Sequence, residues 1–175
     1  AYAASQLSVA VREITKIIGS GQVGTVGVIS PKPNLINVVP GEVYMTVDLR
    51  NIDEKKLKKA EDLLKQKIEH ICLAEKVNVE TEQLVRFKPV NFDKRISNII
   101  ANISDEKGLQ CTRLNSGAGH DAQMMARICP TSMVFVPSKD GISHNPREYT
   151  SKEHLNYGLQ ILYETINRID LNLLD

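Results

Sequence analysis

Two loops, each with a histidine, contain most of the residues in this chain whose side chains could take part in chemistry. Both lie in the stretch NSGAGHDAQMMARICPTSMVFVPSKDGISHNPRE, from Asn115 to Glu148. The first loop runs through a pair of glycines to His120 and Asp121, and the second places His144 before Asn145-Pro146. The two loops lie on either side of one apolar run, which predicts a buried strand.

The first loop, Ser116-Gly117-Ala118-Gly119, predicts an anion site. It should present backbone N–H groups at a helix N-terminus, and its glycines would let a carboxylate approach closely. Alternatively, the glycines only make a tight strand-to-helix turn that Asp121 caps. A nucleophilic triad of Ser116, His120 and Asp121 is a further option, although it lacks the G-x-S-x-G elbow and crowds all three onto one turn.

His144 is a candidate metal ligand. It follows the predicted strand 131–136 by a short loop, and in open α/β sheets ligands bind outside the carboxyl ends of the strands. The alternative is an ordinary surface or hydrogen-bonded loop histidine. His70 and His154 fall in helical patterns and look like ordinary helix residues.

Arg50 and Asn37 are candidates for carboxylate binding. Arg50 closes a predicted strand on its polar side and could grip a carboxylate bidentately, and Asn37 could add its amide. We expect both residues to flank the turn of a hairpin. The alternative is a solvated arginine and a turn asparagine.

The elements that must position Asn37 and Arg50 form an α/β pattern over residues 1–88. Apolar spacing predicts a helix over 2–18, a strand over 22–29, and a second strand that alternates from Val43 to Leu49 and pairs with the first. A helix capped by Asp53 and a strand near 77–85 follow. One more strand before Ala1 would complete a ferredoxin-like βαββαβ unit, so we expect this domain to lack its first strand.

Residues 89–175 form the second predicted domain, after a linker at Phe87-Lys88-Pro89. The expected elements are a helix ending at Gly108, a short strand over 110–114, a helix over 121–128 and a buried parallel strand over 131–136. The last helix should begin at a capping box of Thr150 and Glu153. It should pack through an apolar stripe formed by Leu155, Leu159, Leu162, Ile166 and Ile169.

Composition excludes several classes of protein. The 22 basic residues are balanced by 21 acidic ones and are not gathered into a patch, which argues against a nucleic-acid partner. No run approaches the ~18 apolar residues of a membrane span. The three cysteines are widely spaced among apolar neighbours, which is typical of a reducing cytoplasm rather than of a disulfide framework.

Three stretches, PKPNLINVVPGEVYMTVDLR (31–50), SGAGHDAQMMA (116–126) and MVFVPSKDGISHNPRE (133–148), together resemble a family of metal-dependent amidohydrolases. This family includes N-carbamoyl-L-amino acid hydrolase, allantoate amidohydrolase and β-ureidopropionase, within the aminoacylase and carboxypeptidase superfamily. The resemblance covers the later part of such an enzyme. It implies a lid or dimerisation domain over 1–88 and the C-terminal part of the catalytic domain over 89–175.

The resemblance also implies roles for four residues. His144 would bind one of two divalent metal ions, zinc, manganese or cobalt. Asn37 and Arg50 would reach into the partner subunit's site of a homodimer to hold the carboxylate of a small-molecule substrate, and Gly119 would offer its N–H to that substrate. The expected reaction is hydrolysis of a ureido or amide C–N bond by a hydroxide that the two metal ions activate.

No catalytic residue of the family has a match in this chain. The bridging aspartate, the glutamate base and the lid histidine should lie upstream of Ala1, so we expect the chain alone to be inactive. An aminoacylase or dipeptidase is the enzymatic alternative, and a non-catalytic dimerisation or binding module is the alternative from another class.

Overall fold

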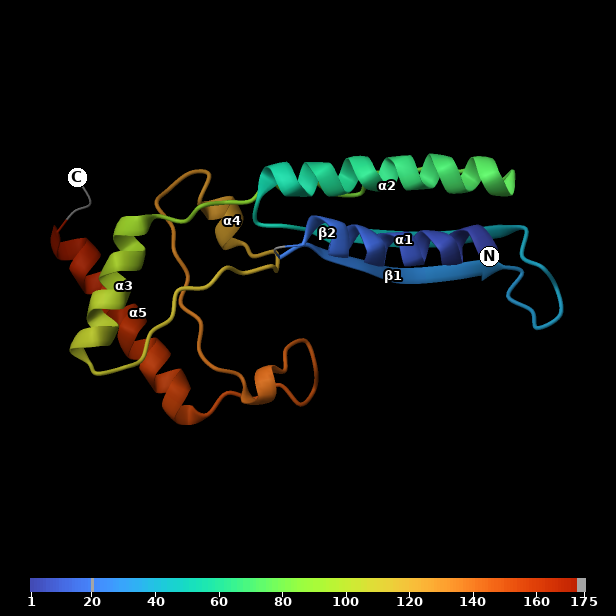
Figure 1. Ribbon diagram of the computed structural model, residues 1–175. Coiled ribbons are helices and arrows are strands. Elements are labelled where there is room, and N and C mark those ends of the chain that lie inside the picture. The colour runs from blue at the N-terminus through green and yellow to red at the C-terminus, as the bar shows by residue number, and fades with distance from the viewer. Residues whose placement is uncertain (20, 173–175) are drawn as a thin grey trace. The chain divides into compact units, whose positions relative to one another are not determined.

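The computed structural model describes residues 1–19 and 21–172 and divides the chain into two compact units, Ala1–Pro89 and Val90–Asp175 (Figure 1). The first unit contains the helices α1 (Tyr2–Ile18) and α2 (Glu54–Glu75) and the strands β1 (Val23–Lys32) and β2 (Glu42–Arg50). The second contains α3 (Lys94–Glu106), α4 (Ala122–Met125), the 3₁₀ turn η1 (Lys139–Gly141) and α5 (Lys152–Asn172). The fold is mixed α/β.

In the first unit, both long helices pack on one face of an antiparallel hairpin of β1 and β2. The core between them contains Leu7 and Ala10 of α1 and Ile71 of α2, with Met45 of β2 packed against it. The alternation of β2 is confirmed, since Met45 faces the helices and the residues next to it point to the open face of the sheet. At Gly24 an added Cβ would lie 2.7 Å from Thr15 Cγ2, so the glycine allows β1 to lie close to α1.

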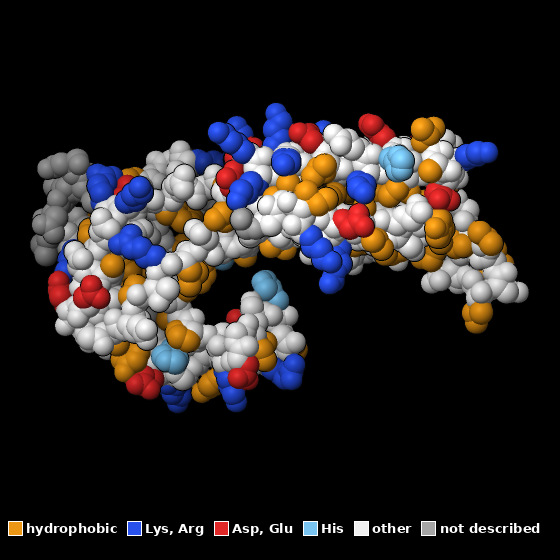
Figure 2. Space-filling view, in the orientation of Figure 1, with side chains coloured by type: hydrophobic (Ala, Val, Ile, Leu, Met, Phe, Trp, Pro, Cys, Tyr) orange, Lys and Arg blue, Asp and Glu red, His pale blue; other side chains and the backbone are white. Residues whose placement is uncertain are grey.

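The predicted boundaries of these elements agree well with the structure. Asp53 caps α2 as expected, because its carboxylate accepts hydrogen bonds from the amides of Lys55 (2.8 Å) and Lys56 (3.2 Å). Lysines and acidic residues alternate over the outer side of α2, and the visible face shows charges of both signs interspersed (Figure 2). No helix in the described part of the chain is long and apolar enough to span a membrane.

The expected strand near Val77–Val85 is wrong. These residues form no ladder with the hairpin, so the sheet of the described residues has two strands in the order β1–β2. A strand exists only with a neighbour that satisfies its backbone groups. Here the apolar side chains of Val79, Leu84 and Val85 are exposed, and the segment is attached to α2 by Arg86, which pairs with Glu54 at 2.9 Å and with Glu61 at 2.5 Å.

In the second unit, α3 and α5 pack together. Ile96 and Ile103 of α3 and Ile161 of α5 are buried. The expected strands at 110–114 and 131–136 do not form in the described residues; the chain runs there without sheet pairing, so the predicted βαβ unit is absent. The expected helix 121–128 contracts to α4, whose four residues are followed by turns as far as Cys129.

The predicted packing of α5 is also wrong. Of the expected stripe, Leu155, Leu159, Leu162 and Ile166 are exposed, whereas Ile161 and Thr165 are buried. Gly158 lies so close to Val136 that an added Cβ would be 2.5 Å from Val136 Cγ1. This approach covers the neighbouring face of the helix, about a quarter of a turn from the predicted stripe. The N-terminal cap is Ser151, whose hydroxyl accepts from the amide of His154 at 3.2 Å, rather than the predicted pair of Thr150 and Glu153.

Candidate functional site

Arg50 ends β2 on the open face of the hairpin, away from both helices. Its guanidinium forms hydrogen bonds with both carboxylate oxygens of Asp48, two residues earlier on the same face, at 2.6 to 3.0 Å. These bonds and the adjacent negative charge raise the pKa of Arg50 above its ordinary value. Half of each side chain is exposed (50% and 49%). Arg50 is therefore a charged, accessible carboxylate binder that already holds a carboxylate of its own chain.

Asn37 lies at the other end of the same hairpin, in the loop that joins β1 to β2, and is exposed. The expectation that Arg50 flanks this turn with Asn37 is wrong, because the register pairs Arg50 with Val23 and Glu42 with Lys32. Eight steps along β2 at ~3.3 Å per residue separate Arg50 from the turn by about 26 Å. One copy of the chain therefore cannot bring Arg50 and Asn37 to the same small carboxylate.

The glycine loop of the second unit is closed by its own side chains. Ser116 Oγ accepts a hydrogen bond from the amide of Ala118 (3.2 Å) and lies 2.8 Å from His120 Nε2. The amide of His120 donates to Gln123 Oε1 at 3.4 Å. The amide of Gly119 has no hydrogen-bond partner in the described residues, and the residue is exposed. This amide is free to donate to a ligand.

Two sequence-based expectations for this loop fail. Asp121 stands at the N-cap position of α4 but its side chain makes no capping hydrogen bond, and a helix of four residues is too short to supply a macrodipole. The triad alternative also lacks its third member, since no hydrogen bond in the described residues joins the Asp121 carboxylate to the His120 ring. What remains is a serine–histidine pair.

His144 lies in an exposed turn after η1, in a left-handed backbone conformation with φ of 53°. Such a conformation is uncommon for a residue other than glycine and is found more often at functional sites than elsewhere. It is held by Glu148, whose carboxylate accepts from the His144 amide at 2.9 Å, and by Asn145, which accepts from the amide of Arg147 at 3.0 Å. The imidazole is left exposed and makes no hydrogen bond in the described part of the chain.

The candidates do not assemble into a metal site. In residues 1–19 and 21–172, no group of three or more histidine, cysteine, aspartate or glutamate side chains lies close enough to hold an ion. No hydrogen bond or ion pair of the described residues joins the Gly119 loop to the His144 turn. His144 could serve as one metal ligand, but a metal centre needs three or four ligands, and the described residues do not bring them together.

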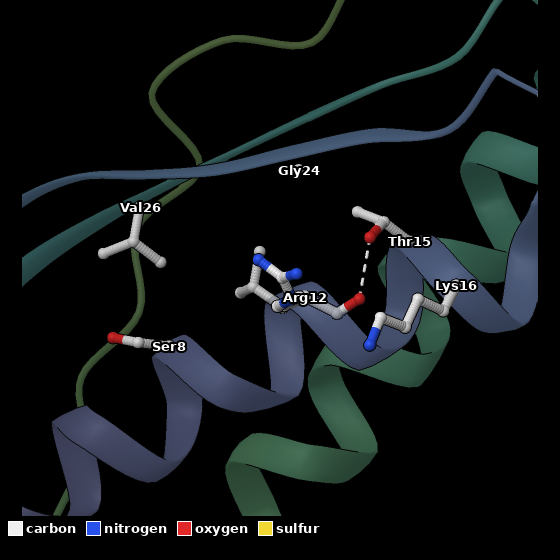
Figure 3. A pocket seen from close by; sticks show the side chains of 7 residues that line it. Ser8, Arg12, Thr15, Lys16, Gly24 and Val26 are labelled. Carbon is white, nitrogen blue, oxygen red and sulfur yellow. Dashed lines mark hydrogen bonds between the residues drawn. The ribbon is translucent and has the colours of Figure 1, made fainter.

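A groove between α1 and β1 was missed by the sequence-based reasoning (Figure 3). Ser8, Arg12, Thr15 and Lys16 line it from α1, and Gly24 and Val26 line it from β1. Its sequence signal is the spacing of Ser8, Arg12 and Lys16 by four, which places them on one helix face. None of the four predicted site residues lies in it.

The chain matches the family model described as peptidase family M20/M25/M40 over residues 8–168. An allantoate amidohydrolase from Bacillus subtilis (strain 168) is 36% identical over 145 residues, which cover 83% of this chain and 35% of that protein. An N-carbamoyl-L-amino-acid amidohydrolase from Rhizobium meliloti is 35% identical over 146 residues, with coverage of 83% and 35%. The crystal structure of AtUAH in complex with glyoxylate superimposes with a TM-score of 0.92 at 30% identity, covering 97% of this chain and 41% of that one. This chain thus spans 35–41% of the length of these relatives.

Proposed function

Because the chain belongs to peptidase family M20/M25/M40, we propose that it is part of a metal-dependent amidohydrolase that cleaves a ureido or amide C–N bond of a small carboxylate. Allantoate and N-carbamoyl-L-amino acids are the proposed substrates. The observation that carries the proposal is the similarity to allantoate amidohydrolase, which extends over 83% of the chain. The first unit is proposed as the lid or dimerisation domain, with two helices and two strands of a ferredoxin-like unit, and the second as the C-terminal part of the catalytic domain.

Arg50 is proposed to release the Asp48 carboxylate and to bind the carboxylate of the substrate in its place. A half-exposed ion pair contributes only about 0–1 kcal/mol, so the exchange costs little, and the planar guanidinium fits a carboxylate bidentately. The AtUAH structure is in complex with glyoxylate, which is itself a small carboxylate. Gly119 is proposed to add its unpartnered amide.

Asn37 is proposed to bind the same carboxylate from a second copy of the chain. About 26 Å of β2 separates Arg50 from the turn that contains Asn37, so a site that uses both is proposed to take them from two subunits. We propose a homodimer with shared active sites on this ground. It refines the expectation that a single partner supplies both residues.

His144 is proposed as a ligand to one of two divalent ions, zinc, manganese or cobalt. Bound there, the ions would activate water and polarise the carbonyl of the scissile group. The turn that holds His144 leaves its ring exposed and without a hydrogen bond among residues 1–19 and 21–172, as a ligand requires. The described residues contain no group of three or more possible metal ligands, so the 175-residue chain by itself is proposed to be inactive.

A substrate panel tests the proposal. The full-length protein, supplied in turn with Mn²⁺, Zn²⁺ and Co²⁺, is assayed against allantoate, N-carbamoyl-L-amino acids, N-acyl amino acids and dipeptides. We expect release of the ureido product from one of the first two and no turnover by the 175-residue chain. Turnover confined to N-acyl amino acids or dipeptides would instead make the protein an aminoacylase or a dipeptidase, and turnover by the short chain would refute the need for further residues.

A further inference from the structure

We propose that Ser116 is a positioning residue that keeps His120 in the tautomer with its proton on Nδ1. The ring then offers a neutral N–H donor, next in the chain to the free amide of Gly119. The role of this donor in binding a carbonyl or carboxylate oxygen rests on the proposed function, whereas the tautomer itself does not.

The tautomer follows from the hydrogen bonds of one hydroxyl group. Ser116 Oγ accepts from the Ala118 amide at 3.2 Å, so one of its lone pairs is used. The hydroxyl lies 2.8 Å from His120 Nε2, and by distance alone either atom could be the donor. We assign the hydroxyl hydrogen to this contact, because Ser116 Oγ donates to no other acceptor in the described residues. A nitrogen that accepts a hydrogen bond carries no proton, so in the neutral ring the proton lies on Nδ1.

The ring is also held from a second element. Its centroid lies 5.6 Å from that of Phe135 with an interplanar angle of 64°, an edge-to-face contact with the segment 131–136. The His120 amide bonds to Gln123 Oε1, which fixes the backbone on the other side. His120 is half-buried, and Nδ1 makes no hydrogen bond in the described part of the chain. Both the orientation of the ring and the position of its free donor are therefore set before any ligand arrives.

Two uncharged donors in adjacent residues suit an sp² oxygen. The Gly119 amide and the His120 Nδ1–H can both donate to the oxygen of a ureido carbonyl or of a carboxylate, and donors that are fixed in advance stabilise negative charge developing on such an oxygen. With the opposite tautomer, Nδ1 would present a lone pair to that oxygen and repel it. Ser116 thus acts through His120 and need not touch the substrate.

The direct test is the ¹⁵N NMR spectrum of histidine side chains in the ¹⁵N-labelled 175-residue chain, at a pH where imidazoles are neutral. The signals that disappear in His120→Asn identify the ring. We expect an unprotonated Nε2 and a protonated Nδ1 in the wild-type chain and in Ser116→Thr, and a predominantly protonated Nε2 in Ser116→Ala. Phe135→Leu is the matched control for general disturbance of the loop, and it should keep the wild-type tautomer.

A protonated Nε2 in the wild-type chain, or an unchanged tautomer in Ser116→Ala, would overturn the proposal. In the full-length protein, Ser116→Ala should lower kcat about tenfold with a smaller change in KM, as expected when a donor acts mainly on the transition state, and Ser116→Thr should restore it. If the full-length protein cleaves no ureido or amide substrate, the proposed function fails, while the tautomer measurement still decides the role of Ser116.

Discussion

At the scale of single residues, the candidate site consists of groups that the fold holds in place but leaves unused. The Arg50 guanidinium forms a half-exposed ion pair with Asp48 on its own strand. The Gly119 amide has no hydrogen-bond partner in the described residues, and the His144 ring is exposed in a strained turn. An unused donor costs little at the surface, where water satisfies it. Each of these groups can therefore exchange water or a weak partner for a ligand.

Replacement of His144 is predicted to weaken metal binding without unfolding the protein. His144→Ala in the full-length protein should lower the affinity for one ion by at least about 100-fold, because it removes a direct ligand, and loss of an outer-shell partner already costs 10–100-fold. Metal content measured by elemental analysis after dialysis at fixed free Zn²⁺ reports the effect. His70→Ala, on the exposed side of α2, is the control and should retain both ions; equal metal content in the two variants would remove His144 from the metal centre.

At the scale of elements, the sequence predicts what local patterns determine. The periodicities of α1, α2 and β2 and the cap at Asp53 depend on neighbours in the chain, and the structure confirms them. The strand at 77–85 and the strands of the second unit depend on partners distant in sequence, which periodicity does not reveal. The sequence alone could not predict that Arg50 lies at the far end of the hairpin. That position depends on the pairing register, which is fixed only when β1 and β2 pair.

The wrong face predicted for α5 has a similar cause. This helix carries apolar residues on more than one face, so the pattern alone does not say which face is covered. The close approach of Gly158 to Val136 decides it and buries Ile161 instead of Leu159. The one signal in the sequence was Gly158 itself, because a glycine in a helix interior often marks a close contact with another segment.

Gly158→Ala should therefore destabilise the second unit, against the helix preference for alanine. Alanine in place of a helical glycine normally stabilises by about 1 kcal/mol, but here the new Cβ would lie 2.5 Å from Val136 Cγ1, and overpacking of this kind costs about 1–3 kcal/mol. Urea unfolding of the 175-residue chain measures the net change. Val136→Ala in the same background should recover most of the loss, and an increase in stability in Gly158→Ala alone would show that the contact is not tight.

At the scale of the whole molecule, the proposed site would need a second subunit if it uses both Arg50 and Asn37. Arg50 ends β2, and Asn37 lies in the loop beyond the other end of that strand, so no movement of the unit as a rigid body brings them together. Two copies related by a two-fold axis can place Arg50 of one beside Asn37 of the other, and the symmetry then creates two such sites. Each site would be incomplete in a monomer.

Complementation between two inactive variants tests this shared site directly, in the full-length protein with its ureido substrate. Arg50→Ala and Asn37→Ala should each lose most activity as homodimers. After equal amounts are mixed and allowed to exchange subunits, half of the dimers are mixed, and each has one site with both residues intact, so activity should return to roughly a quarter of the wild-type value. A mixture of the double variant with wild type controls for exchange. If the mixture of single variants stays as inactive as its parents, Arg50 and Asn37 do not meet across subunits and the shared site is refuted.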